Sequence, residues 1–410
     1  MSKDKDNWLI IELFRWDSLS VDEYTVANRL VNYLVVNLML IGVPTEVKNH
    51  EYRVGLIPAG VRELTRQGHQ VMLQNDAGLG IGFGNAAYES AGARIVATAE
   101  EIFREAEMIV KVKEPQAHER KCLKEDQTLF TYLHLAPDLP QTQDLIDSGS
   151  TCIAYETVTD AMGRLPLLAP MSEVAGRMSI QAGAMCMEKA QGGRGILLGG
   201  VPGVAQGEVL VLGGGVVGQN AAQMAVGMGA RVTIVDRSID VLRRLDNLFG
   251  NRIQTLYSTH DAVEEAAMKA DLIIGAVLIP GAAAPKLITA EMVKRMRAGT
   301  VLVDVAIDQG GCFETSKATT HAEPTYILDD VVHYCVANMP GAVARTSAAA
   351  LNNATLPYVL ELANRGVKSA LTDNVHLLHG LNVFRGQVTN EFVSQAHHLP
   401  YIDPRKAIAA

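Results

Sequence analysis

Three glycines and one acid carry the clearest chemistry in this sequence. Gly213, Gly215 and Gly218 follow the apolar run 209–212 in G-x-G-x-x-G spacing, and Asp236 ends the next apolar run. In this pattern the first glycine permits a tight turn, the second lets a pyrophosphate approach the backbone, and the third lets a helix pack closely on its strand. The N-terminus of that helix attracts phosphates, and the acid accepts hydrogen bonds from the adenosine ribose. The pattern therefore predicts a dinucleotide-binding unit.

Asp236 also bears on the choice of dinucleotide. A carboxylate at this position repels a 2′-phosphate, so we expect NAD rather than NADP, although Arg237 follows immediately and partly offsets this preference. The alternative is a glycine-rich turn without a ligand, because the chain has 36 glycines. The order of strand, glycines, helix, strand and acid favours dinucleotide binding over that alternative. The pattern does not name the reaction.

Four polar residues lie at predicted strand ends or tight loops in apolar surroundings. Arg53 is a candidate to grip a carboxylate through two hydrogen bonds, and Lys113 is a candidate to place a cation on a carboxylate or carbonyl. Histidine is the residue type that most readily exchanges protons near neutral pH, so His134 is a candidate proton shuttle. Asp308 precedes two glycines and is a candidate to orient proton transfer or the nicotinamide ribose.

Each of these residues also has a structural alternative. A lone Arg is more often in a surface salt bridge, a Lys at a strand end often extends its amine to water, a His is often bonded to backbone, and an Asp before glycines often forms an Asx turn. From the residues alone these alternatives stay open. No metal-ligand spacing is present, so we expect no metal site.

The elements that must position these residues alternate along the chain. Apolar runs predict strands at 39–44, 69–73, 108–112, 127–135 (ending near His134), 151–155, 209–212, 232–235, 271–277 and 300–305. Helices are expected between them, for example at 60–68 and 97–105. This alternation predicts parallel α/β layers with helices on both faces, and ligands in such sheets bind at the carboxyl ends of the strands.

Two helical segments lie outside this alternation. The segment 167–190 has apolar residues at helical spacing after a candidate N-cap at Ser172, and we expect a long helix that connects two domains. The segment from Arg345 is helical over 347–362, with a break expected near Pro357. This C-terminal part is expected to return to the first domain.

Length and composition bound the class of protein. A chain of 410 residues suggests two domains. The net charge of −9 and the lack of a long basic run argue against nucleic acid or an anionic membrane surface as partners. Five cysteines without a C-x-x-C pair suit reduced thiols in a cytoplasmic protein, and no apolar stretch reaches the roughly 18–20 residues needed to cross a bilayer. Residues 1–38 differ from the rest and are interpreted as an N-terminal appendage or as translated sequence upstream of the usual start.

Ten ordered runs indicate a family. They are IGVPTEVKNHEYRVGLIPAGV, KVKEP, LHLA, IAYETV, LPLLAPMSEVAGR, GGRGILLGGVPGV, VLGGGVVGQNAA, ADLIIGAVLIPGAAAPKLI, VLVDVAIDQGGCFE and YCVANMPGAV. Through these runs the sequence resembles the bacterial L-alanine dehydrogenases from Met39 nearly to its end. Only residues 1–38 fall outside the resemblance.

The resemblance implies roles for individual residues. Arg53 and Lys113 match residues that bind the substrate carboxylate, and His134 and Asp308 match the catalytic acid–base residues. The positions that match the NAD site of the family are Ser172, Val216, Val217, Asp236, Ser258, Val277, Leu278, Val305, Ala306, Ile307, Asp308, Val336, Ala337, Asn338 and Met339.

The resemblance also implies the architecture. A Rossmann-type NAD domain, at 167–342, is inserted into a discontinuous α/β substrate domain formed by 39–166 and 343–410. The family further implies a homohexamer.

The implied reaction is the reversible oxidative deamination of L-alanine to pyruvate and ammonium, with hydride transfer from Cα to NAD. Two alternatives share the fold. One is the NAD-binding subunit of a proton-translocating transhydrogenase, which would not need Lys113, His134 and Asp308 together to process an amino acid. The other is a non-catalytic NAD-binding protein, which should have lost a polar group of the cleft, and all of these groups are present.

Overall fold

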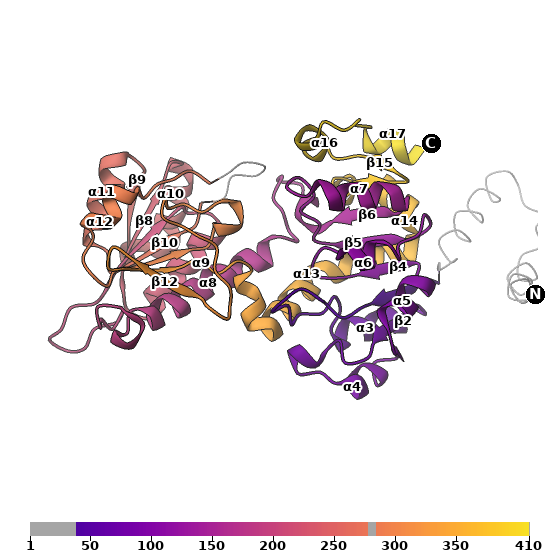
Figure 1. Cartoon of the computed structure of the whole chain (residues 1–410), viewed down its shortest axis with the longest axis horizontal. Coiled ribbons are helices and arrows are strands. Elements are labelled where there is room, and N and C mark those ends of the chain that lie inside the picture. The colour runs from indigo at the N-terminus through magenta and orange to yellow at the C-terminus, as the bar shows by residue number, and fades with distance from the viewer. Residues whose placement is uncertain (1–37, 278–283, 410) are drawn as a thin grey trace, which may run out of the picture.

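The chain folds into two α/β lobes, each built on a largely parallel sheet. The computed structural model describes residues 38–277 and 284–409. Figure 1 shows the two lobes side by side, with helices α8 (Ala169–Cys186) and α13 (Ala344–Arg365) between them. The predicted fold class, a Rossmann-type domain inserted into a second α/β domain, is confirmed. The predicted appendage, residues 1–38, lies outside the described residues except for its last position.

The first lobe contains an eight-stranded sheet in the order β15-β14-β6-β5-β4-β1-β2-β3. Its strands are β1 (Leu40–Val43), β2 (Gln70–Gln74), β3 (Arg94–Val96), β4 (Met108–Val110), β5 (Thr128–Thr131), β6 (Thr151–Ala154), β14 (Leu381–Phe384) and β15 (Gln387–Val388). The strands from β1 to β6 run parallel, and β14 and β15 complete the edge in antiparallel pairing. Continuous apolar runs produce the central strands because helices cover both faces of a parallel sheet.

The second lobe contains a seven-stranded sheet in the order β12-β13-β11-β10-β7-β8-β9. Its strands are β7 (Glu208–Leu212), β8 (Arg231–Asp236), β9 (Ile253–Tyr257), β10 (Leu272–Gly275), β11 (Val301–Asp304), β12 (Thr325–Leu328) and β13 (Val331–Tyr334). All neighbours are parallel except β12 and β13. The order reverses beside β7, so the crevice at the carboxyl ends of β7 and β10 is the switch point at which such sheets bind ligands.

Helices cover both sheets and link the lobes. Those of the first lobe are α3 (Pro58–Arg66), α4 (Asn85–Glu89), α5 (Ala99–Glu105), α6 (Ala117–Arg120), α7 (Leu139–Ser148), α14 (Val367–Asp373), α15 (Val375–Leu378), α16 (Glu391–His397) and α17 (Pro404–Ala409). Those of the second lobe are α9 (Val216–Gly227), α10 (Ile239–Phe249), α11 (His260–Lys269) and α12 (Ala290–Arg295). In the described part of the chain, no helix combines the length and the apolar character needed to span a membrane.

The chain returns to the first lobe after completing the second. Strand β14 pairs with β6, with Leu381 opposite Ile153, so the C-terminal segment extends the sheet that the N-terminal segment began. Sheet membership changes between β6 and β7 and again between β13 and β14. The boundaries 166/167 and 342/343 remain predictions within these limits.

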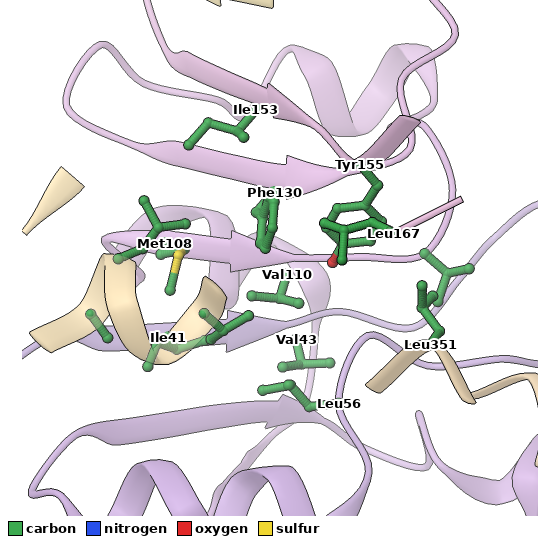
Figure 2. Close-up of a cluster of buried hydrophobic side chains, with 14 of the residues drawn as sticks. Ile41, Val43, Leu56, Met108, Val110, Phe130, Ile153, Tyr155, Leu167 and Leu351 are labelled. Carbon is green, nitrogen blue, oxygen red and sulfur yellow. The ribbon is translucent and has the colours of Figure 1, made fainter. Parts of the chain in front are cut away.

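One buried cluster joins the first sheet to the helices that reach the second lobe. Ile41, Val110 and Phe130 come from adjacent strands, and Leu167 and Leu351 come from the segments at the start of α8 and in α13. Figure 2 shows these side chains gathered over one face of the sheet. Because the two linking segments are buried in this core, they have a fixed position on the first lobe.

Several strands end earlier than expected, and hydrogen bonds explain this for two of them. The strand expected to end near His134 stops at Thr131, because the backbone N–H groups of Leu133 and His134 donate to the carboxylate of Glu156 instead of to a strand. The strand expected to reach 112 stops at Val110, and the N–H of Val112 donates to Glu46 Oε1 over 2.6 Å. Lys113 and His134 therefore lie in loops after their strands.

Two predictions about helices are wrong. Ser172 does not cap α8: the helix begins at Ala169, and the N–H of Ser172 already donates to Leu168 O within it. Pro357 does not break α13, which continues through it to Arg365. A proline inside a helix costs roughly 3 kcal/mol, and the buried side chains of Leu351 and Val359 on either side of it offset that cost.

Candidate active site

The predicted site residues gather at the carboxyl ends of the two sheets. In the first lobe, Arg53, Lys113 and His134 follow β1, β4 and β5, which are parallel neighbours. In the second lobe, the glycines follow β7 and Asp308 follows β11. The carboxyl ends of parallel strands share one edge of a sheet, so each lobe collects its own set of polar groups.

Arg53 is held by an acid two residues away. Its Nε donates to Glu51 Oε1 over 2.7 Å and its Nη2 donates to Glu51 Oε2 over 2.5 Å, so the pair is bidentate. Both side chains are buried. Burial disfavours the charged form of Glu51, but the hydrogen bonds and charge of Arg53 outweigh that effect and keep the pKa of Glu51 below its ordinary value. Glu51 therefore fixes the orientation of the guanidinium.

Arg53 also contacts the second lobe. Its Nη2 donates to Asn338 Oδ1 over 2.8 Å, and Nη1 lies 3.0 Å from Sδ of Met171 on α8. The amide of Asn338 in turn donates to Glu51 Oε2 over 3.0 Å. Asn338 follows β13 and has a left-handed backbone with φ +62°. Arg53, which is predicted to bind the substrate, is thus in direct contact with the segment 336–339, which is predicted to line the cofactor site.

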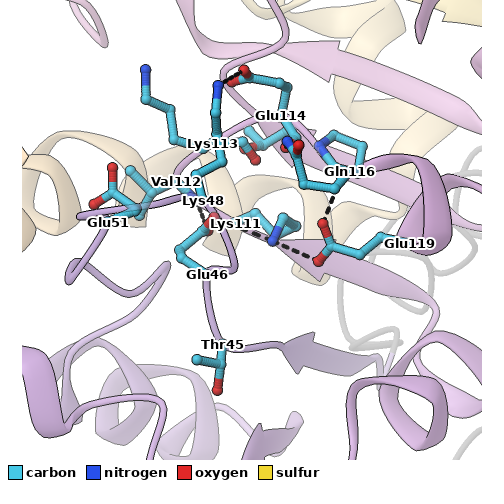
Figure 3. Close-up of polar contacts among 12 residues, drawn as sticks. Thr45, Glu46, Lys48, Glu51, Lys111, Val112, Lys113, Glu114, Gln116 and Glu119 are labelled. Atoms are coloured by element: carbon cyan, nitrogen blue, oxygen red, sulfur yellow. Dashed lines mark hydrogen bonds and ion pairs between the residues drawn. The ribbon is translucent and has the colours of Figure 1, made fainter. Parts of the chain in front are cut away.

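A fully buried charge cluster precedes Lys113. Lys111 Nζ lies 2.9 Å from Glu119 Oε1 and 3.2 Å from Glu46 Oε2 (Figure 3). Burial lowers the pKa of Lys111, but Glu46 and Glu119 outweigh it and the net pKa is raised, so the amine is charged. Glu46 also accepts the Val112 N–H, and Glu119 accepts the Gln116 N–H in a capping box at the start of α6. The loop that carries Lys113 is therefore held on both sides.

Lys113 itself is half-buried at the centre of that loop. Its carbonyl accepts a hydrogen bond of 3.0 Å from Thr131 Oγ1 at the end of β5. The next residue, Glu114, forms an ion pair with Lys48. This arrangement leaves the backbone of Lys113 fixed and its side chain at the same sheet edge as Arg53.

His134 lies in a tight turn with a left-handed backbone, φ +50°. Its N–H donates to Glu156 Oε1 over 2.6 Å, and its Nδ1 lies 3.8 Å from the same oxygen. The imidazole stacks on Tyr132 with ring centroids 5.8 Å apart and planes 4° from parallel. The ring is about half exposed. A carboxylate near one nitrogen and an accessible second nitrogen suit a group that takes up and releases protons.

Tyr132 connects this histidine to the linking segment. Its hydroxyl donates to Leu167 O over 2.5 Å, and burial raises its pKa, so the hydroxyl stays protonated. Leu167 is two residues before α8, the helix that carries Met171. The segment at the start of α8 therefore contacts Arg53 directly and contacts His134 through Tyr132.

The glycine loop has the geometry that phosphate binding requires. Gly213 has φ +97°, and a Cβ on Gly218 would lie far inside contact distance of the Gly213 carbonyl oxygen. A Cβ on Gly215 would meet nothing within 4 Å, so the backbone there is open to a ligand. Gly215 is also the N-cap of α9 and provides no side-chain cap. The free N–H groups and the helix dipole fit a pyrophosphate.

Asp236 is half-buried beside this loop. Its Oδ2 accepts the Gly214 N–H over 2.7 Å, and its Oδ1 accepts the Ser238 N–H over 2.8 Å. Ser258, which follows β9, donates its N–H to Asp236 O over 3.0 Å. The carboxylate thus lies at the predicted ribose position, and the residues present fit a dinucleotide.

The other predicted cofactor residues occupy neighbouring strand ends. Val216 and Val217 open α9, Val277 follows β10, and 305–308 follows β11, while 336–339 follows β13. Ser172 lies on α8. Leu278 lies outside the described residues. Apart from Leu278 and Ser172, these positions lie at or near the carboxyl ends of the strands of the second sheet.

Asp308 lies on an exposed turn between two buried elements. The preceding Asp304 is fully buried, and its carboxylate accepts hydrogen bonds from the N–H of Ala306 and Cys312 and from the hydroxyl of Ser316. Burial raises the pKa of Asp304. In the described ranges, no hydrogen bond joins the side chain of Asp308 to His134 or Arg53.

Several residues of the site were not predicted from the sequence. They are Glu46, Glu51, Lys111, Glu119, Tyr132, Glu156 and Met171. Glu51 had a usable signal, because an acid two residues from a candidate Arg is a common partner. Glu46, Glu156 and Met171 reach their partners over long sequence separations, and no local pattern predicts such contacts.

Two family domains match this chain. The N-terminal domain described as alanine dehydrogenase/PNT matches residues 42–175, and the C-terminal domain of the same description matches residues 179–391.

Close relatives match almost the whole chain. An alanine dehydrogenase of Halomonas elongata is 61% identical over 370 residues, which are 90% of this chain and 100% of the relative. An alanine dehydrogenase of Bacillus subtilis is 56% identical over 372 residues, or 90% of this chain and 98% of the relative.

Solved structures share the fold. A structure of an L-alanine dehydrogenase has a TM-score of 0.85 and 52% identity, and the match covers 88% of this chain and 99% of that one. A transhydrogenase from Sinorhizobium meliloti has a TM-score of 0.75 at 22% identity, with 85% and 99% of the two chains covered, which shows the fold alone.

Proposed function

The chain belongs to the alanine dehydrogenase/PNT family, and from this membership we propose that it is an L-alanine dehydrogenase that uses NAD. Relatives with 52–61% identity over 90% of the chain are named alanine dehydrogenases, which makes the chain an enzyme and an oxidoreductase. The family implies a nicotinamide dinucleotide as the cofactor. The reaction we propose is the reversible conversion of L-alanine to pyruvate and ammonium.

The observation that carries the proposal is the contact between Arg53 and Asn338. A buried guanidinium of the first lobe, fixed by Glu51, reaches the edge of the sheet that carries the glycine loop. Four of its five N–H groups have partners among the described residues, counting the contact with the sulfur of Met171. The remaining Nη1 N–H is a donor for a carboxylate at the boundary of the lobes.

The residues of the first lobe would bind the amino acid. We propose that Arg53 and Lys113 hold the carboxylate, because two cations at one sheet edge neutralise it and fix the direction of Cα. When NAD is bound, its nicotinamide ring is the hydride acceptor. The ammonium group of the amino acid loses a proton and Cα loses a hydride, which together leave the protonated imine of the substrate.

His134 would move the protons of the second half-reaction. The imine takes up water, and the imidazole removes a proton from that water and returns one to the leaving amine. Glu156 lies 3.8 Å from Nδ1 and stabilises the imidazolium that forms between these steps. Asp308 would complete the acid–base set from the second lobe after the lobes approach each other, since the described structure does not join it to His134.

We propose NAD rather than NADP because of Asp236. Its carboxylate lies half-buried between the Gly214 and Ser238 N–H groups, where a 2′-phosphate would meet a negative charge. A fluorescence titration with both cofactors tests this choice. The expected result is tighter binding of NAD, and equal affinity for the two cofactors would refute it.

We also propose that the enzyme is a cytoplasmic homohexamer, as the family resemblance implies. Light scattering of the purified chain gives its mass in solution. A mass near six times 44.1 kDa supports the hexamer, and a monomer contradicts it.

The experiment for the activity is direct. The purified chain is mixed with L-alanine and NAD, and the absorbance of the reduced cofactor is followed, with D-alanine and no amino acid as controls. L-alanine-dependent reduction supports the proposal. Binding of NAD without reduction indicates a non-catalytic protein, and hydride exchange between two dinucleotides without alanine turnover indicates a transhydrogenase subunit.

A further inference from the structure

The loop that carries Asp308 is closed by one lysine. Lys286, in the segment before α12, donates from Nζ to three backbone carbonyls of this loop, those of Gly310, Gly311 and Phe313. The distance is 3.0 Å to Gly311 O and 3.2 Å to Phe313 O. An ammonium group has three donors and no acceptor, so this one group is completely satisfied by the loop.

The other two carbonyls of the loop, those of Gln309 and Cys312, accept hydrogen bonds from the same segment. Ala284 donates its N–H to Gln309 O over 3.0 Å, and Leu287 donates its N–H to Cys312 O over 2.8 Å. Five consecutive carbonyls, 309–313, therefore receive donors from residues 284–287. The segment 284–287 therefore holds the loop in place through these hydrogen bonds.

The opposite side of the loop is held by Asp304. Its carboxylate accepts the N–H of Cys312 over 2.8 Å and the N–H of Phe313 over 3.4 Å. A Cβ on Gly311, which has φ +78°, would collide with this carboxylate. Lys286 therefore binds carbonyls of the loop, and Asp304 binds the N–H groups of Cys312 and Phe313. The loop lies between a cation on one side and an anion on the other.

Asp308 lies within this closed turn. The N–H groups of Gln309 and Gly310 donate to Ala306 O and Ile307 O over 2.9 Å, so the backbone on both sides of Asp308 is bonded. The side chain of Asp308 is exposed. Because every backbone group from 309 to 313 has a partner, the backbone position from which the Asp308 side chain projects is fixed.

We propose that Lys286 is a positioning residue for Asp308. Lys286 touches only the backbone of the loop, and its ammonium fixes the three carbonyls that turn the chain back after Asp308. This role rests on the proposed acid–base function of Asp308. Asp304 performs the matching task from the buried side.

The test uses Lys286→Met in the full chain, because Lys286 is exposed and the methionine keeps most of its length. We expect kcat to fall roughly 10–100-fold, since a shift of about 1 Å at a reacting group costs on the order of 100-fold, while the thermal midpoint and the KM for alanine change little. Lys286→Arg keeps donors for the carbonyls and should recover part of the lost kcat. Lys294→Met, an exposed lysine on α12, is the matched control and should leave kcat unchanged.

A double-mutant cycle separates positioning from a general structural role. If Lys286 acts through Asp308, Lys286→Met combined with Asp308→Asn should be no slower than Asp308→Asn alone. Two losses that multiply would overturn the proposal, and so would a kcat of Lys286→Met within twofold of the wild type.

Amide exchange gives a readout that does not depend on turnover. We expect faster hydrogen exchange in the peptide that covers 305–313 of Lys286→Met, and no change in Lys294→Met. Unchanged exchange in that peptide would also overturn the proposal. If the wild-type chain shows no alanine-dependent reduction, the proposed function fails together with this role, whereas an active wild type with an unaffected Lys286→Met refutes the positioning role alone.

Discussion

The two lobes hold their reactive loops in different ways. In the first lobe, charged side chains fix one another in buried surroundings: Glu51 binds Arg53, and Lys111 binds Glu46 and Glu119. In the second lobe, the loop after β7 is shaped by glycines and presents backbone N–H groups at the start of α9.

This difference suits the ligands that we propose for each lobe. A small anionic substrate needs cations, and a cation in a buried site must itself be compensated by acids. The phosphates of a dinucleotide can be bound by backbone N–H groups at a helix end, which need close approach rather than charge. The substrate-side loops of the first lobe should therefore be sensitive to changes of charge, and the glycine loop of the second lobe to changes of volume.

The largest effect should come from the first lobe alone. We expect His134→Ala to lower turnover roughly 10²–10⁴-fold, the usual cost of a lost acid–base group, with little change in the affinity for NAD. Steady-state kinetics and a cofactor titration on the same preparation measure both quantities. Unchanged turnover would remove His134 from the mechanism, and a parallel loss of NAD affinity would show that the lobes are not separable in this way.

The buried cluster gives the next largest effect, on stability. Lys111→Met removes the cation between two buried acids, and breaking such a pair costs about 3–5 kcal/mol. The combined variant Lys111→Met, Glu46→Gln should be less destabilised than Lys111→Met alone, because it leaves fewer unpaired charges. Urea unfolding of both variants measures the free energies, and a single variant as stable as the wild type would show that the cluster does not hold the loop.

The second lobe should respond to added volume. Gly218→Ala places a Cβ against the Gly213 carbonyl, and crowding of this kind costs about 1–3 kcal/mol. Gly215→Ala is the matched control, because a Cβ there meets nothing within 4 Å. We expect a lower thermal midpoint for the first variant alone, and weaker NAD binding for both. Equal midpoints for the two variants would contradict the packing argument.

The sequence was sufficient for the parts of the fold that depend on local patterns. The apolar run 209–212 became β7, and the G-x-G-x-x-G spacing placed the turn at Gly213, because burial and glycine geometry act over a few residues. The sequence was insufficient to predict the end of a strand where a residue far away in the chain takes its hydrogen bonds. Strand β5 stops at Thr131 because Glu156 takes the next N–H groups, and that acid belongs to the segment after β6.

The site followed the same division. Lys113 and His134 could be selected because each follows an apolar run, and Arg53 because it precedes one, but their partners could not be selected. Glu46 pairs with Lys111 from the loop after β1, the strand next to β4, and Met171 contacts Arg53 from helix α8. Such pairs depend on the order of strands in the sheet, which hydrophobic periodicity does not encode.

The last prediction concerns the stability that the Glu51–Arg53 pair contributes and its dependence on pH. Glu51→Gln should lower the free energy of unfolding by roughly 1.5–3 kcal/mol at pH 7, the usual value of a hydrogen bond to a charged group. The pKa of Glu51 is lower in the folded chain, because the hydrogen bonds and charge of Arg53 outweigh the effect of burial. Its stabilisation is therefore complete above the unfolded pKa, about 4.3, and is lost as the pH falls through the folded pKa.

The difference in stability between wild type and Glu51→Gln should accordingly stay constant from pH 7 to about pH 5 and shrink at lower pH. Glu63→Gln is the control, since Glu63 pairs with Arg66 on the surface, where ion pairs contribute about 0–1 kcal/mol. Urea unfolding across this range measures both differences. If the difference in the free energy of unfolding between wild type and Glu51→Gln grows as the pH falls, Glu51 does not hold Arg53 as an ionised partner. The contrast between the charged loops of the first lobe and the glycine loop of the second would then lose its main support.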